Sequence, residues 1–139
     1  IIELFYLFEL IEIGTYQEPV SAGYGNVIDD STMKLQVYPQ TKVSSQADYC
    51  VIVSGDSMFP LYEEGDILFV KKAETLKNNE IGIFFHNNET ICKRYNLKGD
   101  IVILISENKE YEPRKVLPEE LVIRGKVLGK YHVDWGFLS

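Results

Sequence analysis

The sequence predicts a mostly β domain, and three of its features support that prediction. Short runs rich in Val, Ile, Phe and Tyr recur along the chain, turns of Gly, Asn and Asp separate them at short intervals, and no stretch has a convincing helical pattern. A chain of 139 residues, 45% apolar and 25% charged, is long enough to bury a core. We therefore expect one domain of compact antiparallel β-sheets.

The first ten residues, IIELFYLFEL (1–10), are left unassigned. The glutamates at positions 3, 9 and 12 fit neither one face of a helix nor strict strand alternation. They also interrupt an apolar stretch far shorter than the roughly 20 residues that a membrane span needs, so we expect no membrane contact. Because the chain starts at Ile1 rather than at Met, we expect a fragment or a processed product. In that case residues 1–10 would be a linker remnant and residues 11–139 the domain.

The next segment, YQEPVSAGYGNVIDDS (16–31), is polar, rich in small residues and poor in core residues. Such composition between apolar runs is typical of a surface loop. We expect an exposed, mobile loop here.

The stretch VIVSGDSMFPLYEEGDILFV (51–70) places two apolar strands around a polar interruption. Gly55 allows the backbone to turn without a Cβ penalty, and Pro60 keeps the following segment from continuing the strand. We expect this geometry to lift the hydroxyl of Ser57 out of the sheet.

Three further strands are expected in the second half of the chain. Residues 80–86 and 89–95 should pair antiparallel across the turn Asn87-Asn88, because Asn tolerates the positive φ of a tight hairpin. A second hairpin turn is expected at 98–100. The segment LVIRGKVLGKYHV reads as a closing strand, with Gly125 and Gly129 at bulges or close approaches.

A serine hydroxyl becomes a good nucleophile only when a neighbouring base takes its proton. His86 lies beside the Asn-Asn turn, where we expect it to be exposed, and His132 lies in the closing strand without an acidic partner close in sequence. The spacing therefore gives no support to a Ser-His-Asp triad.

A lysine is the alternative base, provided that burial lowers its pKa enough to keep the amine neutral. In ETICKRY, strand alternation places Lys93 on the same side as Ile91 and Tyr95, and Arg94 on the opposite side. We expect the Lys93 side to be the apolar one.

Charge and cysteine content exclude several classes of function. The formal net charge of −7 argues against this chain itself gripping a phosphate backbone, and the first 33 residues contain no Lys or Arg, unlike a targeting peptide. Cys50 and Cys92 have no metal-ligand spacing and are too sparse for a disulfide framework. We expect two buried thiols in a reducing compartment, with no metal site and no cofactor.

Taken together, SGDSMFP, then EEGD, then ICKR, in this order and spacing, resemble the self-cleaving Ser-Lys peptidase domain of the LexA, UmuD and phage CI repressor family. The resemblance covers roughly residues 11–133. It implies a β fold like that of LexA and signal peptidase, with an exposed cleavage loop, Ser57 as nucleophile and Lys93 as general base. The turn 64–66 matches the family's acidic-Gly-Asp turn, and SENKEYEP (106–113) resembles its PEN-type turn.

The same resemblance implies a cleavage site. Members cleave themselves most often between Ala and Gly in a loop that precedes the nucleophile, and Ala22-Gly23 is such a bond. Val20 and Ser21 would complete the substrate loop on its N-terminal side. The backbone N–H groups of Asp56 and Ser57 would hold the oxyanion.

The resemblance also implies partners and a setting: a cytoplasmic homodimer, a RecA filament as co-protease in the DNA-damage response, and operator DNA bound through an N-terminal domain absent from this chain. Two alternatives stay open. One is a UmuD-like protein that serves a DNA polymerase, and the other is a dimerisation module that keeps the motif without cleaving. Signal peptidases share the Ser-Lys chemistry but need a membrane anchor, which the N-terminal glutamates disfavour.

Overall fold

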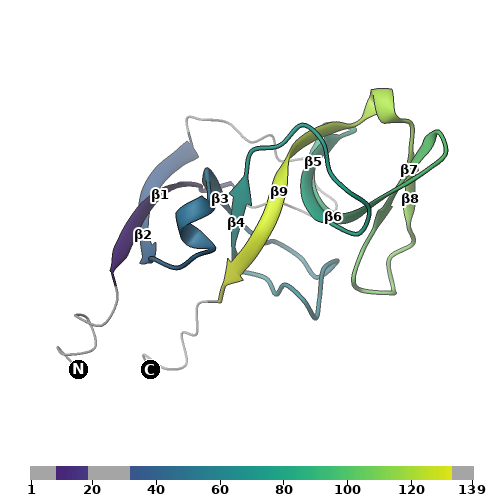
Figure 1. Cartoon of the computed structure of the whole chain (residues 1–139). Helices are drawn as coiled ribbons and strands as arrows, with labels where there is room; N and C mark the ends of the chain where they lie inside the picture. The colour runs from purple at the N-terminus through teal and green to yellow at the C-terminus, as the bar shows by residue number, and fades with distance from the viewer. Residues whose placement is uncertain (1–8, 19–31, 133–139) are drawn as a thin grey trace.

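Nine β-strands form the framework of the computed structural model, which describes residues 9–18 and 32–132 (Figure 1). In chain order they are β1 (Leu10–Tyr16), β2 (Met33–Pro39), β3 (Tyr49–Ile52), β4 (Ile67–Lys71), β5 (Ile81–His86), β6 (Glu89–Lys98), β7 (Ile101–Ile105), β8 (Arg114–Val116) and β9 (Val122–Tyr131). The helices of the described residues are two short 3-10 turns, η2 (Ser44–Gln46) and η3 (Pro118–Glu120). The predicted mostly β fold is confirmed.

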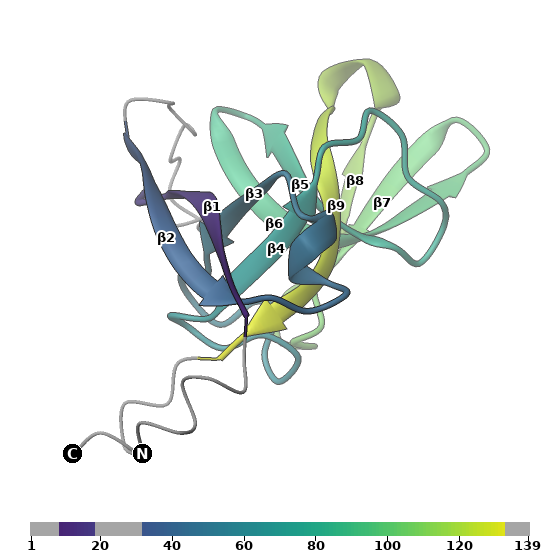
Figure 2. The same cartoon turned by 60° about the vertical axis from the view of Figure 1, so that its left-hand side comes forward.

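All nine strands belong to one sheet, in the order β2-β1-β3-β4-β9-β5-β6-β7-β8. Every neighbouring pair is antiparallel except β1 and β3, which are joined in parallel. Figure 1 shows β1 and β2 at one end, the curled strands β5–β8 at the other, and β4 and β9 between them, and in the turned view of Figure 2 β1 and β2 again lie on the side away from β7 and β8. The last strand therefore joins the two halves of the molecule.

Both predicted hairpins are present. Asn87 and Asn88, between β5 and β6, have φ angles of 51° and 59°. A two-residue type I′ hairpin turn requires positive φ at both of these positions. Gly99, between β6 and β7, has a φ of 60°. Local turn chemistry thus sets the register of β6, the strand that carries Lys93.

The two glycines of β9 lie beside irregularities in the sheet, as predicted. Gly125 pairs with β5 where the register shifts, and Gly129 pairs with β4 at a second shift. A Cβ on Gly125 would lie 2.8 Å from the carbonyl oxygen of Lys71. The absence of a side chain at this position lets two strands approach closely.

Three clusters of buried apolar side chains pack on the sheet. The first joins β3 and β4 to the segment between them, which contributes Met58. The second lies within β5–β8 around Phe84, and the third lies near η2 around Phe69. Cys50 and Cys92 are both buried free thiols, as expected. Because Met58 is anchored in the first cluster, the neighbouring Ser57 is held against the core.

Residues 1–8 and 19–31 lie outside the described residues, so the domain boundary and the loop expected at 16–31 stay predictions. Among residues 9–18 and 32–132, no helix is long and apolar enough to cross a bilayer.

Candidate active site

The segment that carries Ser57 leaves the sheet after β3 and returns at β4. Its neck is closed by two backbone hydrogen bonds, from Val53 N–H to the Asp66 carbonyl (2.9 Å) and from Gly65 N–H to the Val53 carbonyl (2.8 Å). Gly55 and Gly65 have φ angles of 80° and 89°, which glycine adopts without steric cost. We call residues 53–66 the nucleophile loop.

Ser57 and Lys93 meet inside the protein. Lys93 Nζ lies 2.9 Å from Ser57 Oγ, and both side chains are about 95% buried, with exposed fractions of 5% and 4%. Lys93 comes from the middle of β6, where it pairs with Gly82 of β5. The hydroxyl therefore has a buried amine as its hydrogen-bond partner.

Burial lowers the pKa of Lys93 from 10.5 to about 8, because water no longer solvates the ammonium. Nearby charges act in both directions: Cys92 raises this pKa, Arg114 lowers it and Glu89 raises it. With a pKa near 8, about a tenth of the amine is neutral at pH 7. A neutral amine is the form that can accept the serine proton.

Both sides of β6 are buried around Lys93. Lys93 shares its side of the strand with Ile91 and Tyr95, which are buried in the second cluster. The opposite side is covered as well, since Thr90 and Cys92 are buried there. One side contributes to the second cluster, and Cys92 on the other side belongs to the first cluster together with Met58 of the nucleophile loop.

The segment 106–113 contacts both members of the pair. Asn108 donates from its backbone N–H to the Ser57 carbonyl (3.0 Å) and from Nδ2 to the Asp56 carbonyl (3.1 Å). The hydroxyl of Tyr111 donates to Asp56 Oδ1 (2.5 Å), and the centroid of its ring lies 5.8 Å from Lys93 Nζ. This segment thus holds the backbone on both sides of the Asp56–Ser57 peptide bond.

The backbone N–H groups of Asp56 and Ser57 were predicted to bind an oxyanion. Among residues 9–18 and 32–132, neither has a hydrogen-bond acceptor. Next to them is an open depression of about 500 Å³ lined by Gly55, Asp56, Phe59, Glu63 and Glu64. Within the described part of the chain, both donors therefore lack an acceptor and lie next to an open depression.

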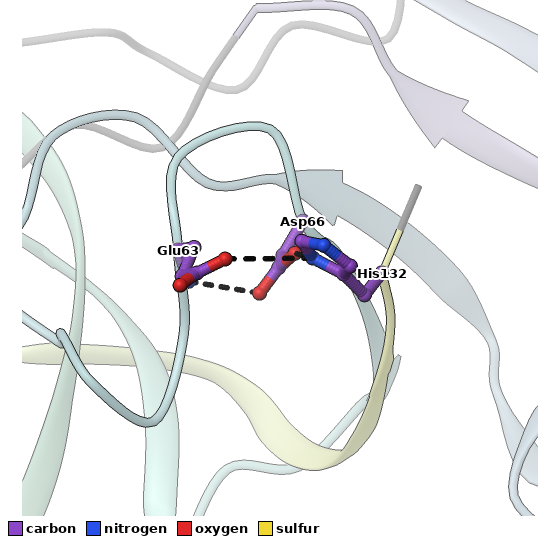
Figure 3. Close-up of side chains that lie close together, drawn as sticks. All are labelled: Glu63, Asp66 and His132. Carbon is purple, nitrogen blue, oxygen red and sulfur yellow. Dashed lines mark hydrogen bonds and ion pairs between the residues drawn. The ribbon is translucent and has the colours of Figure 1, made fainter. Parts of the chain in front are cut away.

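Asp66 ties the nucleophile loop to the end of β9. It is 1% exposed, and its Oδ2 accepts the backbone N–H of Glu63 at 2.8 Å and lies 3.6 Å from Lys130 Nζ. Its Oδ1 lies 2.5 Å from Nδ1 of His132, and Glu63 Oε2 lies 3.7 Å from the same nitrogen. Figure 3 shows these three side chains close together. Lys130 also donates to the Leu61 carbonyl at 2.8 Å. This arrangement satisfies the buried carboxylate internally.

His86 differs from the sequence-based expectation, and His132 has a partner that the sequence did not indicate. His86 is buried at 6% exposure, because Arg114 of β8 covers it and lies 3.1 Å from its Nδ1. His132 follows β9 and has no acidic partner close in sequence, as expected, but it contacts the distant Asp66. Within the described part of the chain, neither histidine contacts Ser57, so lysine remains the only base within its reach there.

The predicted substrate residues Val20, Ser21, Ala22 and Gly23 lie outside the described residues. The contacts of Tyr111 and Asp66 were not predicted from the sequence. The resemblance of segment 106–113 to a family turn was the one signal that pointed to the first of them.

Comparison with known proteins identifies similar proteins of one family. A profile described as Peptidase S24-like matches residues 15–128. The LexA repressor of Marinomonas sp. (strain MWYL1) is 37% identical over 113 residues, which cover 79% of this chain and 55% of that protein. The LexA repressor of Shewanella sediminis (strain HAW-EB3) is 38% identical over 93 residues, covering 64% of this chain and 45% of that protein. The chain thus spans about half the length of the curated relatives it matches.

Proposed function

Because the chain belongs to the Peptidase S24-like family, we propose that it is the self-cleaving domain of a LexA-like transcriptional repressor, cutting its own Ala22-Gly23 bond with Ser57 and Lys93. The observation that carries this proposal is the contact of 2.9 Å between Lys93 Nζ and Ser57 Oγ in a buried setting. A buried lysine whose pKa is lowered to about 8 is suited to act as a general base near neutral pH.

In the proposed reaction, neutral Lys93 removes the proton from Ser57 Oγ while that oxygen attacks the carbonyl carbon of Ala22. The N–H groups of Asp56 and Ser57 stabilise the oxyanion that forms. The bond to the Gly23 nitrogen then breaks, and the protonated Lys93 donates its proton to the leaving amine. Water, deprotonated by Lys93, hydrolyses the resulting ester between Ala22 and Ser57 and restores the serine.

The pKa of Lys93 sets the expected pH dependence. Below about pH 8 the neutral fraction of the amine rises nearly tenfold for each pH unit, and above it the fraction levels off. We expect the rate of self-cleavage to follow this curve. A rate that is flat or falls between pH 6 and pH 8 would contradict the role given to Lys93.

The direct test is the intact mass of the purified chain after incubation at neutral and alkaline pH. The expected products are residues 1–22 and 23–139, absent from Ser57→Ala and Lys93→Ala. Lys98→Ala is a matched control, because Lys98 lies on the same strand but is exposed, and it should cleave like the wild type. Wild-type chain that stays intact at every pH, even with an added RecA filament, would favour the non-cleaving dimerisation module instead.

The wider assignment rests on the resemblance and on relatives named as repressors. We propose a cytoplasmic homodimer, cleavage stimulated by a RecA filament after DNA damage, and operator binding through a separate N-terminal domain. Sedimentation of the Ser57→Ala chain tests the dimer, and cleavage rates with and without the filament test the stimulation.

A further inference from the structure

Tyr111 contacts both Asp56, the residue before the proposed nucleophile, and Lys93, the proposed base. Its hydroxyl donates to Asp56 Oδ1, next to the nucleophile, and its ring faces Lys93 Nζ with the centroid 5.8 Å away. The side chain is 39% exposed, so the apolar core does not require it. Asn108 anchors the same segment through bonds to the Asp56 and Ser57 carbonyls.

Asp56 is an unfavourable residue to place beside an oxyanion site. It begins a turn closed by a hydrogen bond of 3.1 Å from Phe59 N–H to its own carbonyl. At such a position a free aspartate side chain can bend back onto its own N–H or onto the N–H two residues ahead, that of Met58. There the carboxylate would compete for the Asp56 donor and repel the negative charge that develops at the oxyanion. The bond from Tyr111 occupies Oδ1 of this carboxylate and therefore competes with that arrangement.

The ring has a second effect, on Lys93. The ring centroid lies 5.8 Å from Lys93 Nζ, so the ring occupies space next to the amine that water would otherwise fill. The other groups that act on this amine are Arg114 of β8, with Glu89 and Cys92 of its own strand. A ring face also attracts an ammonium, but at 5.8 Å that attraction is near the limit of its range. Exclusion of water is therefore the larger effect.

We propose that Tyr111 is a positioning residue for self-cleavage: its hydroxyl holds the Asp56 carboxylate away from the oxyanion N–H groups, and its ring keeps water from Lys93. This inference rests on the proposed function. It adds a residue that touches neither the scissile bond nor the transferred proton.

The first test compares cleavage rates on the alkaline plateau. Tyr111→Phe keeps the ring but frees the carboxylate, and should slow cleavage about tenfold, the value of one charge-assisted hydrogen bond. Adding Asp56→Asn to Tyr111→Phe removes the carboxylate charge and should restore the rate to within about threefold of the wild type. Tyr131→Phe, at another partly exposed tyrosine, is the control and should have no effect. A wild-type rate for Tyr111→Phe, or no recovery in the double variant, would overturn the role of the hydroxyl.

The second test does not depend on cleavage. In the Ser57→Ala background, the titration of Lys93 is followed by NMR of the labelled side chain. Tyr111→Ala should raise the midpoint by about one pH unit, because water gains access to the amine, whereas Tyr111→Phe should leave it unchanged. An unchanged midpoint in Tyr111→Ala would overturn the role of the ring. If the wild type fails to cleave, the proposed function fails, and this titration still decides what the ring does.

Discussion

Burial of Lys93 should cost the folded state stability, and replacing the residue should recover it. The change is Lys93→Met, which keeps most of the aliphatic stem and removes the amine. Both proteins carry Ser57→Ala, so that self-cleavage cannot interfere at alkaline pH. Because Lys93 is 5% exposed, its ammonium is shielded from water in the folded chain and hydrated in the unfolded chain.

The magnitude follows from the two pKa values. Folding lowers the pKa of Lys93 from 10.5 to about 8, and each pKa unit corresponds to about 1.4 kcal/mol. At pH 7 the amine is protonated in both states, so the penalty is fully present, at about 3 kcal/mol. Between pH 8 and 10.5 the unfolded chain binds more protons than the folded chain, so the stability of the lysine protein rises with pH. At pH 9.5 the remaining penalty is about 1 kcal/mol.

The assay is urea unfolding at pH 7 and pH 9.5, analysed for a two-state transition. The methionine variant should be more stable by about 3 kcal/mol at pH 7 and by about 1 kcal/mol at pH 9.5. Lys98→Met, at an exposed position of the same strand, should show no such pH dependence. A stability difference equal at the two pH values would mean that Lys93 titrates like an exposed lysine, and the proposed base would lose its physical support.

Three further predictions concern the framework around the site. His132→Gln should lower the melting temperature more at pH 5.5 than at pH 8, because the hydrogen bond to Asp66 raises the pKa of His132. The stabilisation from a raised histidine pKa is present below about pH 6.5 and is lost as pH rises. An equal loss at both pH values would argue against a charged pair. Gly125→Ala should lower the free energy of unfolding in urea by about 1–3 kcal/mol, since the new Cβ would lie 2.8 Å from a backbone carbonyl oxygen. Gly129→Ala should lower it less, because the nearest contact of its Cβ is a side-chain methyl group at 3.0 Å. Phe84→Ala should cost about 3–5 kcal/mol by the same measurement, because the ring is fully buried in the second cluster; a loss below about 1 kcal/mol would mean that the cluster rearranges freely.

The parts of the fold that were predictable depend on neighbouring residues. Asn87 and Asn88 tolerate positive φ, so the β5–β6 hairpin and its register follow from two adjacent residues. Gly55 likewise indicates where the chain leaves the sheet. Alternation along β6 then places Lys93 on the side of Ile91, without any knowledge of the rest of the molecule.

The parts that were missed depend on residues distant in sequence. His86 is buried because Arg114, 28 positions away, folds over it, and no pattern around the Asn-Asn turn indicates this. Asp66 and His132 are separated by 66 positions and meet only because β9 inserts between β4 and β5. The contact of Tyr111 with Asp56 spans 55 positions. Such pairings depend on the strand order of the whole sheet, which local propensity does not specify.

The hairpin of β1 and β2 separates chemical scission from physical release. Seven residue pairs, from Leu10–Pro39 to Tyr16–Met33, join the two strands, and Thr15 also pairs with Cys50 of β3. A break in the backbone anywhere between Tyr16 and Met33 would leave this ladder uncut. The protein would then become a non-covalent complex of two pieces, with β1 of the N-terminal piece held between β2 and β3 until it dissociates. The rate of cleavage and the rate at which the two pieces dissociate would therefore differ. Denaturing mass measurement would report the first, and native chromatography would report the second.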